Sequence, residues 1–262
     1  MADQGQNTDV ILDLDGRLAL LVFKAGRAAF ANYIYAVFDI RSRDAVLIDP
    51  GWDGDTVLRV IGELGLRLRA VVVTHCHADH VNAVPHIAQI SGCPVYMSIQ
   101  EHKSLDLPRA QIRTLDGDYS FSAGTVSVLA LETPGHTWGS ITYVIGKRMF
   151  TGDTLFAEGC GLCAAPSGNS DDLFRSLQKL KSRATGDTRV YPAHRYRAVP
   201  GQRFDRVQSI NMYLRLTDPE AFRAFCNRPN RSAKKPPLPG TVPVMTTIYD
   251  MTPIAAPATD LS

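Results

Sequence analysis

The 262-residue sequence contains no apolar stretch close to the roughly 20 residues that a helix needs to cross a bilayer. Its first ten residues, MADQGQNTDV, also lack the charged start and apolar core of a secretory signal peptide. The sequence therefore predicts a cytoplasmic protein with no membrane partner. Hydrophobic residues make up 45% of the chain and charged residues 21%, which is typical of a globular domain with a sizeable core.

Cysteine is scarce: the chain has five, an odd number. An odd count without a secretion signal argues against a disulfide framework. Cys160 and Cys163 have the CxxC spacing of a redox pair or half a zinc knuckle, but no second CxxC exists. We therefore interpret them as loop thiols beside the functional site.

Histidine is also rare, with seven residues, yet three of them lie in the stretch VTHCHADH. This stretch follows the β-branched run RAVVVT, which predicts a buried strand, and it precedes a segment with helical apolar spacing. Open α/β sheets keep their active sites at such strand ends. In extended backbone His75 and His77 point to the same side, and Asp79 and His80 follow on the turn. One short segment can thus offer two neighbouring sets of metal ligands.

Strand-like and helix-like segments alternate along the rest of the chain, without a short internal repeat. Strands are expected within residues 11–23 (a hairpin), 32–40, 45–51, 69–74 and 94–97, and then within 118–122, 125–132, 141–146, 148–153 and 189–194. Helices are expected at 53–64 with Asp53 as N-cap, at 79–90, at 170–182 with Ser170 as N-cap, and at about 204–225. Two groups of strands interleaved with helices predict two mixed sheets packed face to face with helices outside.

The chain is expected to consist of one domain followed by a C-terminal tail. Residues 1–226 are predicted to form one domain. Residues 227–262 are rich in proline and lack periodicity, so they are predicted to form an extended or disordered tail.

Three further polar residues follow strand-like runs, each after a small or turn-forming residue. His136 lies in TPGHTWGS, Asp153 in FTGDTLF and His194 in VYPAHRY. With the first cluster they make seven candidate ligands, five histidines and two aspartates: His75, His77, Asp79, His80, His136, Asp153 and His194.

The motifs THxHxDH, PGHT, TGDT and PAH, in this order and at these separations, resemble the metallo-β-lactamase fold family over about residues 18–215. The resemblance implies an α/β fold, a four-layered αββα sandwich with the site at one rim between the sheets. It also implies a ligand set for each of two metals, with a bridging carboxylate between them: His75, His77 and His136 for one, Asp79, His80 and His194 for the other, and Asp153 as the bridge.

Imidazole and carboxylate ligands suit two zinc ions, and iron or manganese as well. Two divalent ions roughly 3.5–4 Å apart can lower the pKa of a bridging water towards about 7, and the resulting metal-bound hydroxide attacks a carbonyl carbon. Asp79 and Asp153 are thus the catalytic candidates, with Asp79 orienting the nucleophile and moving its proton.

The segments GDTLFAEGCGLC, DDLFRSLQKLK and VYPAHRYRAVPGQ resemble the zinc-dependent hydrolases of bacterial polyketide pathways whose acyltransferases act in trans. That resemblance implies hydrolysis of acyl thioesters carried by acyl carrier protein. From Lys181 to Lys235 the chain has 13 Lys and Arg against 4 Asp and Glu, a local charge of +9, and the remainder has 15 against 22, or −7. Because acyl carrier proteins are acidic, we expect the carrier to bind near three arginines, Arg195, Arg197 and Arg203.

Four other side chains near the ligands have weaker signals. Tyr143 and Tyr196 are candidates for contact with the substrate, although packing is the favoured interpretation for both. Asn32, at the start of a strand, is interpreted as a structural polar residue. Trp138 is expected to pack against the rim of the sheet.

Alternatives from the same fold remain. The segment TGDTLFAEGCG resembles glyoxalase II (hydroxyacylglutathione hydrolase) and persulfide dioxygenases, in which an arginine is usual where Leu162 stands. The dioxygenase would use one iron held by His75, His77 and Asp153, so a metal count separates it from a two-zinc hydrolase. A metal-dependent nuclease is a distant alternative, because basic strips interleaved with aromatic residues are absent and no nucleic-acid partner is expected.

Overall fold

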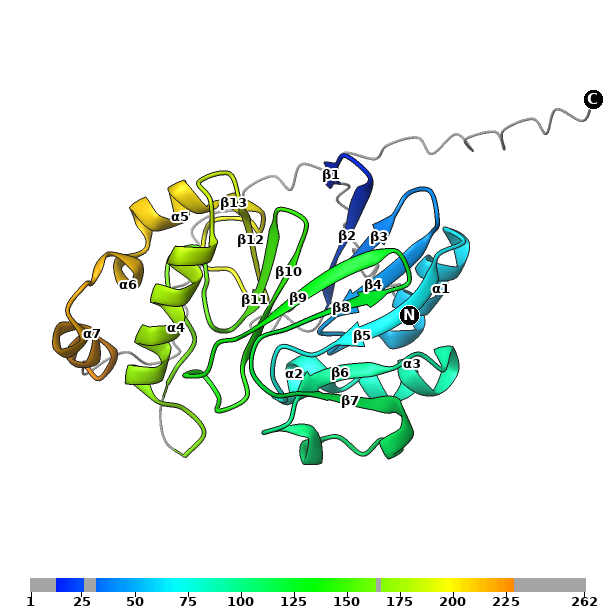
Figure 1. The fold of residues 1–262 in the computed structure, drawn as a ribbon, viewed down its shortest axis with the longest axis horizontal. Helices are drawn as coiled ribbons and strands as arrows, with labels where there is room; N and C mark the ends of the chain where they lie inside the picture. Colours follow the sequence, from blue (N-terminus) through cyan, green and yellow to red (C-terminus); the bar gives the residue numbers. More distant parts are fainter. Residues whose placement is uncertain (1–12, 26–31, 164–165, 229–262) are drawn as a thin grey trace, which may run out of the picture.

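The computed structural model describes residues 13–25, 32–163 and 166–228, which form two mixed sheets packed between outer helices (Figure 1). The first sheet has the order β1-β2-β3-β4-β5-β6-β7, antiparallel from β1 to β4 and parallel from β4 to β7. Its strands are β1 (Asp13–Asp15), β2 (Leu18–Ala25), β3 (Asn32–Asp39), β4 (Asp44–Ile48), β5 (Arg67–Val72), β6 (Val95–Ser98) and β7 (Ile112–Leu115).

The second sheet has the order β13-β12-β11-β10-β9-β8, in which only β11 and β12 run parallel. Its strands are β8 (Tyr119–Ala123), β9 (Val126–Glu132), β10 (Ile141–Ile145), β11 (Arg148–Gly152), β12 (Arg189–Pro192) and β13 (Gln202–Arg203).

Helices cover the outer face of each sheet, on opposite sides of the molecule in Figure 1. On the first sheet lie α1 (Gly54–Glu63), α2 (Ala78–Val81) and α3 (Val84–Ser91), and on the second α4 (Ser170–Arg183), α5 (Phe204–Ile210), α6 (Met212–Arg215) and α7 (Pro219–Cys226). Short 3-10 turns occur at His102–Ser104 and Arg109–Gln111.

The strands of the first sheet are apolar on both faces because both faces are covered. In β3, Ile34 and Ala36 pack with α1 and α3, whereas Tyr35 and Val37 pack between the two sheets. A third apolar cluster joins the second sheet to α4–α7. These three apolar layers confirm the predicted four-layered αββα sandwich.

Two predicted helices are divided in the structure. The segment predicted at 79–90 forms α2 and α3, because Pro85 in the first turn of α3 has no N–H with which to continue the earlier helix. The segment predicted at 204–225 forms α5, α6 and α7. Its first break is at Asn211, whose amide nitrogen donates to the carbonyls of Phe156 and Gly159, both at 2.9 Å.

Smaller details also differ from the prediction. The N-cap of α4 is Asn169 rather than Ser170, since the side chain of Asn169 accepts hydrogen bonds from the backbone N–H groups of Asp171 and Asp172. Asp53 precedes α1 as predicted, but its side chain makes no capping hydrogen bond. The strands β7 and β13 were not anticipated.

None of the helices in the described ranges combines the length and apolar character that a bilayer crossing requires. The Pro-rich tail predicted from residue 227 lies outside the described residues from 229 onward.

Candidate metal centre

All seven predicted ligands lie together where strands of both sheets end. Four follow β5, and the others follow β9, β11 and β12. Three groups have donor atoms within 4.8 Å of one another: His75, His77 and His136; His75, His80 and Asp153; and Asp79, His80 and His194. Segments from four strands thus contribute to one cluster of donor atoms.

Three histidines meet in the first group. The Nδ1 atom of His77 lies 3.0 Å from Nε2 of His75 and 3.0 Å from Nε2 of His136. Nδ1 of His136 donates to the carbonyl of Leu162 at 2.6 Å, which leaves Nε2 with its lone pair towards the cluster. Ligands about 2.1 Å from one tetrahedral ion lie roughly 3.4 Å apart, so this spacing is close to that of a shared metal.

Burial favours the neutral form of the His75 and His136 imidazoles. Desolvation, followed by the nearby histidines, places the pKa of His75 well below its ordinary value. Burial also lowers the pKa of His136, although the carboxylate of Asp153 opposes this. A neutral imidazole is the form that binds a metal.

The second group contains Asp79, His80 and His194. Oδ2 of Asp79 lies 3.2 Å from Nε2 of His194 and 3.7 Å from Nε2 of His80. Burial would lower the pKa of His80, but the carboxylate of Asp49, 2.9 Å from its Nδ1, outweighs this and raises the pKa to about 9. The local field at His80 therefore favours a positive charge.

Asp153 stands between the two groups. Its Oδ2 lies 3.6 Å from Nε2 of His136, and its Oδ1 lies 3.5 Å from Nε2 of His80 and of His194. One oxygen thus faces each set of histidines.

Two unsatisfied polar atoms indicate that the donor set fits a bound divalent metal. Nε2 of His80 and Oδ1 of Asp153 are buried, and neither has a hydrogen-bond partner among the described residues. Such unsatisfied polar atoms are costly unless something else binds them. Nitrogen and carboxylate ligands are those that zinc and iron accept.

Asp49 was missed by the sequence analysis, although it holds the ligand His80 and also Thr74, the residue before the ligand His75. Its carboxylate accepts from the backbone N–H of Thr74 at 2.7 Å, from the hydroxyl of Thr74 at 2.6 Å and from His80. The signal was present in IDPG, an acid after an apolar strand, the same pattern that identified Asp153. It was interpreted only as the end of a strand.

Asn32 and Glu101 also support the ligands. The amide of Asn32 donates to the carbonyl of Asp79 at 2.8 Å and to its Oδ2 at 3.1 Å, so this buried residue has a more specific role than predicted. Glu101 accepts from the backbone N–H of Cys76 at 2.5 Å and of Gly139 at 3.3 Å. No local sequence pattern marks Glu101, because its partners are distant along the chain.

Close backbone approach requires glycine beside the ligands. Gly152, directly before Asp153, has a φ of +48°, and a Cβ atom there would lie 2.3 Å from the hydroxyl of Thr74. At Gly51 a Cβ atom would lie 1.7 Å from the carbonyl of Asp79. Any larger residue at either position would displace a ligand loop.

The two tyrosines are placed differently. Tyr143 is fully buried, and its hydroxyl donates to the carbonyl of Val73 at 3.0 Å, which favours the packing role. Tyr196 is exposed at the rim, with its ring 5.7 Å from that of Phe156, which in turn lies 6.0 Å from the ring of His194.

The three arginines do not form one group. Arg195 and Arg197 directly flank Tyr196, next to His194. Arg203 pairs in register with Arg189 at the start of β12, whereas His194 follows the end of that strand. Its guanidinium also binds Asp205 at 2.7 Å. Arg203 is therefore separated from His194 by the length of β12.

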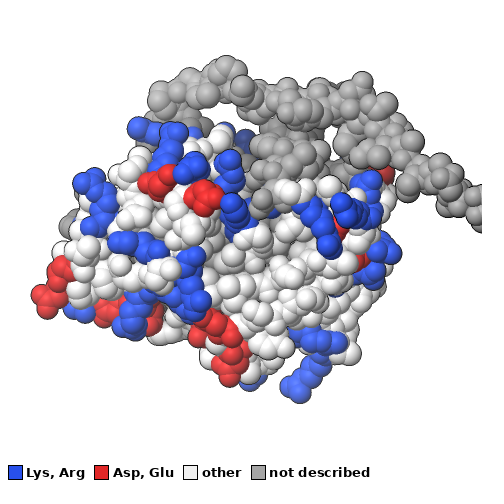
Figure 2. Space-filling model, turned by 45° about the horizontal axis from the view of Figure 1, so that its top comes forward, with Lys and Arg blue, Asp and Glu red and all other residues white. Residues whose placement is uncertain are grey.

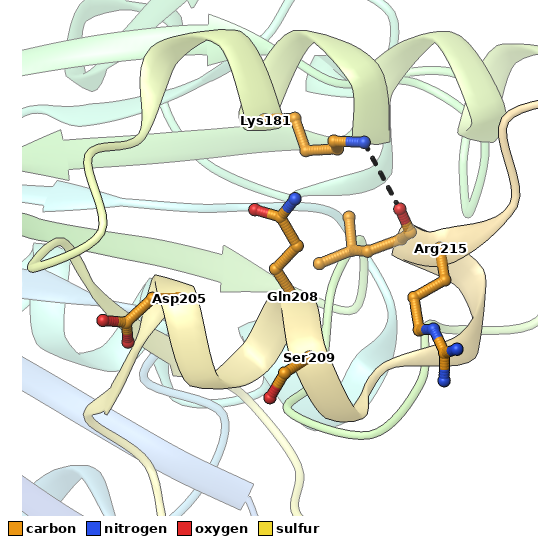
Figure 3. Close-up of a pocket in the computed structure, with 6 residues that line it drawn as sticks. Lys181, Asp205, Gln208, Ser209 and Arg215 are labelled. Atoms are coloured by element: carbon orange, nitrogen blue, oxygen red, sulfur yellow. Dashed lines mark hydrogen bonds between the residues drawn. The ribbon is translucent and has the colours of Figure 1, made fainter.

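A separate hollow of about 460 Å³ lies between α4, α5 and α6 (Figure 3). Lys181 and Gln208 point into it, and the amine of Lys181 lies 3.5 Å from the carbonyl of Leu214. None of the seven candidate ligands lines this hollow. The cluster of histidines and aspartates is therefore the candidate site of chemistry.

Known proteins are similar to this chain over most of its length. The profile of the metallo-beta-lactamase superfamily matches residues 29–194. The chain is 35% identical to the probable polyketide biosynthesis zinc-dependent hydrolase PksB of Bacillus subtilis, over 77% of this chain and 90% of that one. It is 33% identical to the human mitochondrial persulfide dioxygenase ETHE1, over 75% and 76%.

Among solved structures, ETHE1 from Myxococcus xanthus has a TM-score of 0.69 and 28% identity, covering 80% of this chain and 92% of that one. TTHA1623 in a di-iron-bound form has a TM-score of 0.62 and 27% identity, covering 74% and 100%.

Proposed function

Because the chain belongs to the metallo-β-lactamase superfamily, we propose that it is a dinuclear zinc hydrolase that cleaves acyl thioesters on an acyl carrier protein. The observation that carries the proposal is the pair of ligand sets facing the two oxygens of Asp153. It agrees with the similarity to a hydrolase described as zinc-dependent and as part of polyketide biosynthesis.

We propose that the ligands divide between the metals as the family resemblance implies. His75, His77 and His136 would hold one cation, Asp79, His80 and His194 the other, and Asp153 both. When bound, two divalent cations polarise a carbonyl oxygen and acidify water. Zinc is the proposed metal, with iron or manganese as alternatives that the same ligands accept.

Hydrolysis forms a bond from the oxygen of water to the thioester carbon and breaks the bond from that carbon to sulfur. The proton lost by water must reach the departing sulfur. We assign this transfer to Asp79, whose side chain is 28% exposed, against 12% for Asp153. Burial would raise the pKa of Asp79, but His194, His80 and Asn32 outweigh it and lower that pKa, so the carboxylate is ionised. A lowered pKa makes it a weak base, so its proposed role is to orient the water and pass its proton on rather than to retain it.

We further propose that the carrier binds beside His194. Arg195 and Arg197 lie one and three residues after this ligand, and a phosphopantetheine arm carries a phosphate that guanidinium groups bind well. Arg203, at the far end of β12 and paired with Asp205, is a weaker candidate for this contact. Tyr196 remains a candidate for contact with the arm.

Residues 1–226 are proposed as the catalytic unit. The rings of Phe174 in α4 and Phe222 in α7 are 5.3 Å apart, and both belong to the apolar cluster against the second sheet. The helices that follow His194 are thus packed with the fold that carries the ligands.

A persulfide dioxygenase is the second candidate, favoured by the similarity to ETHE1 in sequence and structure. A single iron at His75, His77 and Asp153 would leave Asp79, His80 and His194 without a metal. The convergence of that second group supports the two-metal hydrolase instead.

Hydrolysis assays with the same acyl group attached to each of three thiols test the proposal. We would compare acyl carrier protein, pantetheine and glutathione thioesters with zinc-loaded protein, and count metals by mass spectrometry. We expect about two zinc ions per chain and a preference for the carrier or pantetheine form. Preference for glutathione would favour glyoxalase II activity. One iron, no hydrolysis and oxygen uptake with a persulfide would establish the dioxygenase.

A further inference from the structure

Exposed apolar side chains occur in the loop that carries His136 and in the loop that holds its ring. Trp138 is 52% exposed and lies two residues after His136. Leu162 is 47% exposed, and its carbonyl accepts the hydrogen bond from the ring of His136 at 2.6 Å. Trp138 is thus close to His136 along the chain, and Leu162 is linked to His136 by a hydrogen bond.

The indole of Trp138 is held in place while its ring remains exposed. Its N–H donates to the carbonyl of Pro166 at 2.8 Å. The ring is therefore less covered than the predicted packing against the rim of the sheet implies. An aromatic ring oriented by its polar end offers apolar surface at little entropic cost.

The two sides of the centre differ in chemistry. The loops TPGHTWGS (residues 133–140) and GCGLC (159–163) contain no charged side chain apart from His136. On the other side, the segment after His194 reads RYR, with an exposed Tyr196 between Arg195 and Arg197. An elongated substrate that spans the centre would therefore meet an apolar end and a basic end.

We propose that Trp138 and Leu162 form the binding surface for an extended apolar acyl chain. The acyl chain lies on the His136 side of the centre, and the thiol carrier lies on the His194 side. This inference rests on the proposed function and specifies its substrate class: thioesters of medium or long apolar acyl groups, in preference to acetyl or small polar groups.

The preference should be measurable as a ratio. Each methylene that leaves water contributes roughly fourfold in binding. We expect kcat/KM for the octanoyl thioester of N-acetylcysteamine to exceed that for the acetyl thioester. In Trp138→Ala and in Leu162→Ala the octanoyl-to-acetyl ratio should fall about tenfold. Leu162→Ala keeps the main-chain carbonyl that accepts the hydrogen bond from His136.

Ile90→Ala is the matched control, since Ile90 is an exposed apolar residue on α3. It should leave the ratio and the metal content unchanged. An equal loss for both substrates in the Trp138 and Leu162 variants, or no loss, would overturn the inference. A change in oligomeric state with an unchanged ratio would also overturn it and would assign the surface to contact between copies.

A binding measurement separates this inference from the proposed function. An octyl thioether analogue, which has no carbonyl group to hydrolyse, should shift the fluorescence of Trp138 to shorter wavelength, and Trp138→Phe should lose this shift. A shift with the octyl and not the ethyl thioether, in a protein that hydrolyses no thioester, would retain the acyl surface and reject the hydrolase. No shift would reject the acyl surface.

Discussion

At the scale of single residues, several candidate ligands are oriented by a second polar group. Nδ1 of His80 contacts Asp49, Nδ1 of His136 donates to the carbonyl of Leu162, and Asp79 accepts from Asn32. Such partners set the tautomer and the direction of the ligand atom. The affinity of the centre therefore depends on residues that do not contact the metal.

Asp49→Asn should weaken metal binding about 10- to 100-fold, because an amide orients and polarises His80 less than a carboxylate does. Competition with a chromogenic chelator measures this. Asp55→Asn is the matched control, since Asp55 contacts His86 at 2.6 Å on the surface. Equal affinities in the two variants would contradict the assigned role of Asp49.

At the scale of elements, the centre requires loops from both sheets to keep fixed positions relative to one another. Glu101 lies after β6, and it connects the loop after β5, at Cys76, with the loop after β9, at Gly139. It thereby joins the loops that carry the three histidines of the first group.

Glu101→Gln should loosen this connection, because the amide NH₂ cannot accept from a backbone N–H. A buried N–H that loses its acceptor costs about 1–3 kcal/mol. We expect a lower melting temperature and less zinc bound per chain at limiting zinc. Glu63→Gln, which alters an exposed pair with Arg59, should change neither. A stable variant with full zinc content would show that Glu101 does not position these loops.

At the scale of the whole molecule, acidic partners offset part of the positive charge of the C-terminal third. On the face that Figure 2 shows, acidic side chains lie among the lysines and arginines. Arg203 pairs with Asp205 and Arg223 with Asp171, and part of the +9 lies beyond residue 228. Carrier binding is therefore better tested at Arg195 and Arg197 than over the whole region.

One buried carboxylate links the two sheets. Asp39, at the end of β3, binds Arg17, the backbone N–H groups of Arg41 and Ser42, and the hydroxyl of Thr125 between β8 and β9. Burial would raise its pKa, but these four contacts outweigh burial and lower the pKa to about 2.

The sign of the resulting pH dependence follows from this lowered pKa. Ionised Asp39 should stabilise the fold fully above its unfolded pKa of about 3.9, and this stabilisation is lost as pH falls through about 2. Urea unfolding of metal-free protein at pH 5 and at pH 2 should show that Asp39→Asn costs stability at pH 5 and much less at pH 2.

Asp187→Asn is the comparison for Asp39. Lys147 lowers the pKa of Asp187 to about 2 as well, but Asp187 is exposed, so solvent should reduce its effect at every pH. A cost of Asp39→Asn that is the same at both pH values would contradict the assignment.

The sequence was sufficient to determine the fold class and the seven candidate ligands, because both depend on local patterns. Apolar runs predict strands, and a His or Asp after such a run predicts a group at a sheet edge. The breaks within 79–90 and 204–225 also had local causes, in Pro85 and Asn211, but the second acts through the distant carbonyls of Phe156 and Gly159.

Only the tertiary structure decided which groups share an environment. Asp49, Asn32 and Glu101 reach the centre from separate segments, so their roles depend on contacts that span 25 to 47 residues of chain. The pairing of β12 with β13 places Arg203 away from Arg195. The contact between Trp138 and Pro166 leaves the ring of Trp138 exposed. Packing sets both. Residue order determines which side chains are available, and packing of the two sheets determines which of them meet.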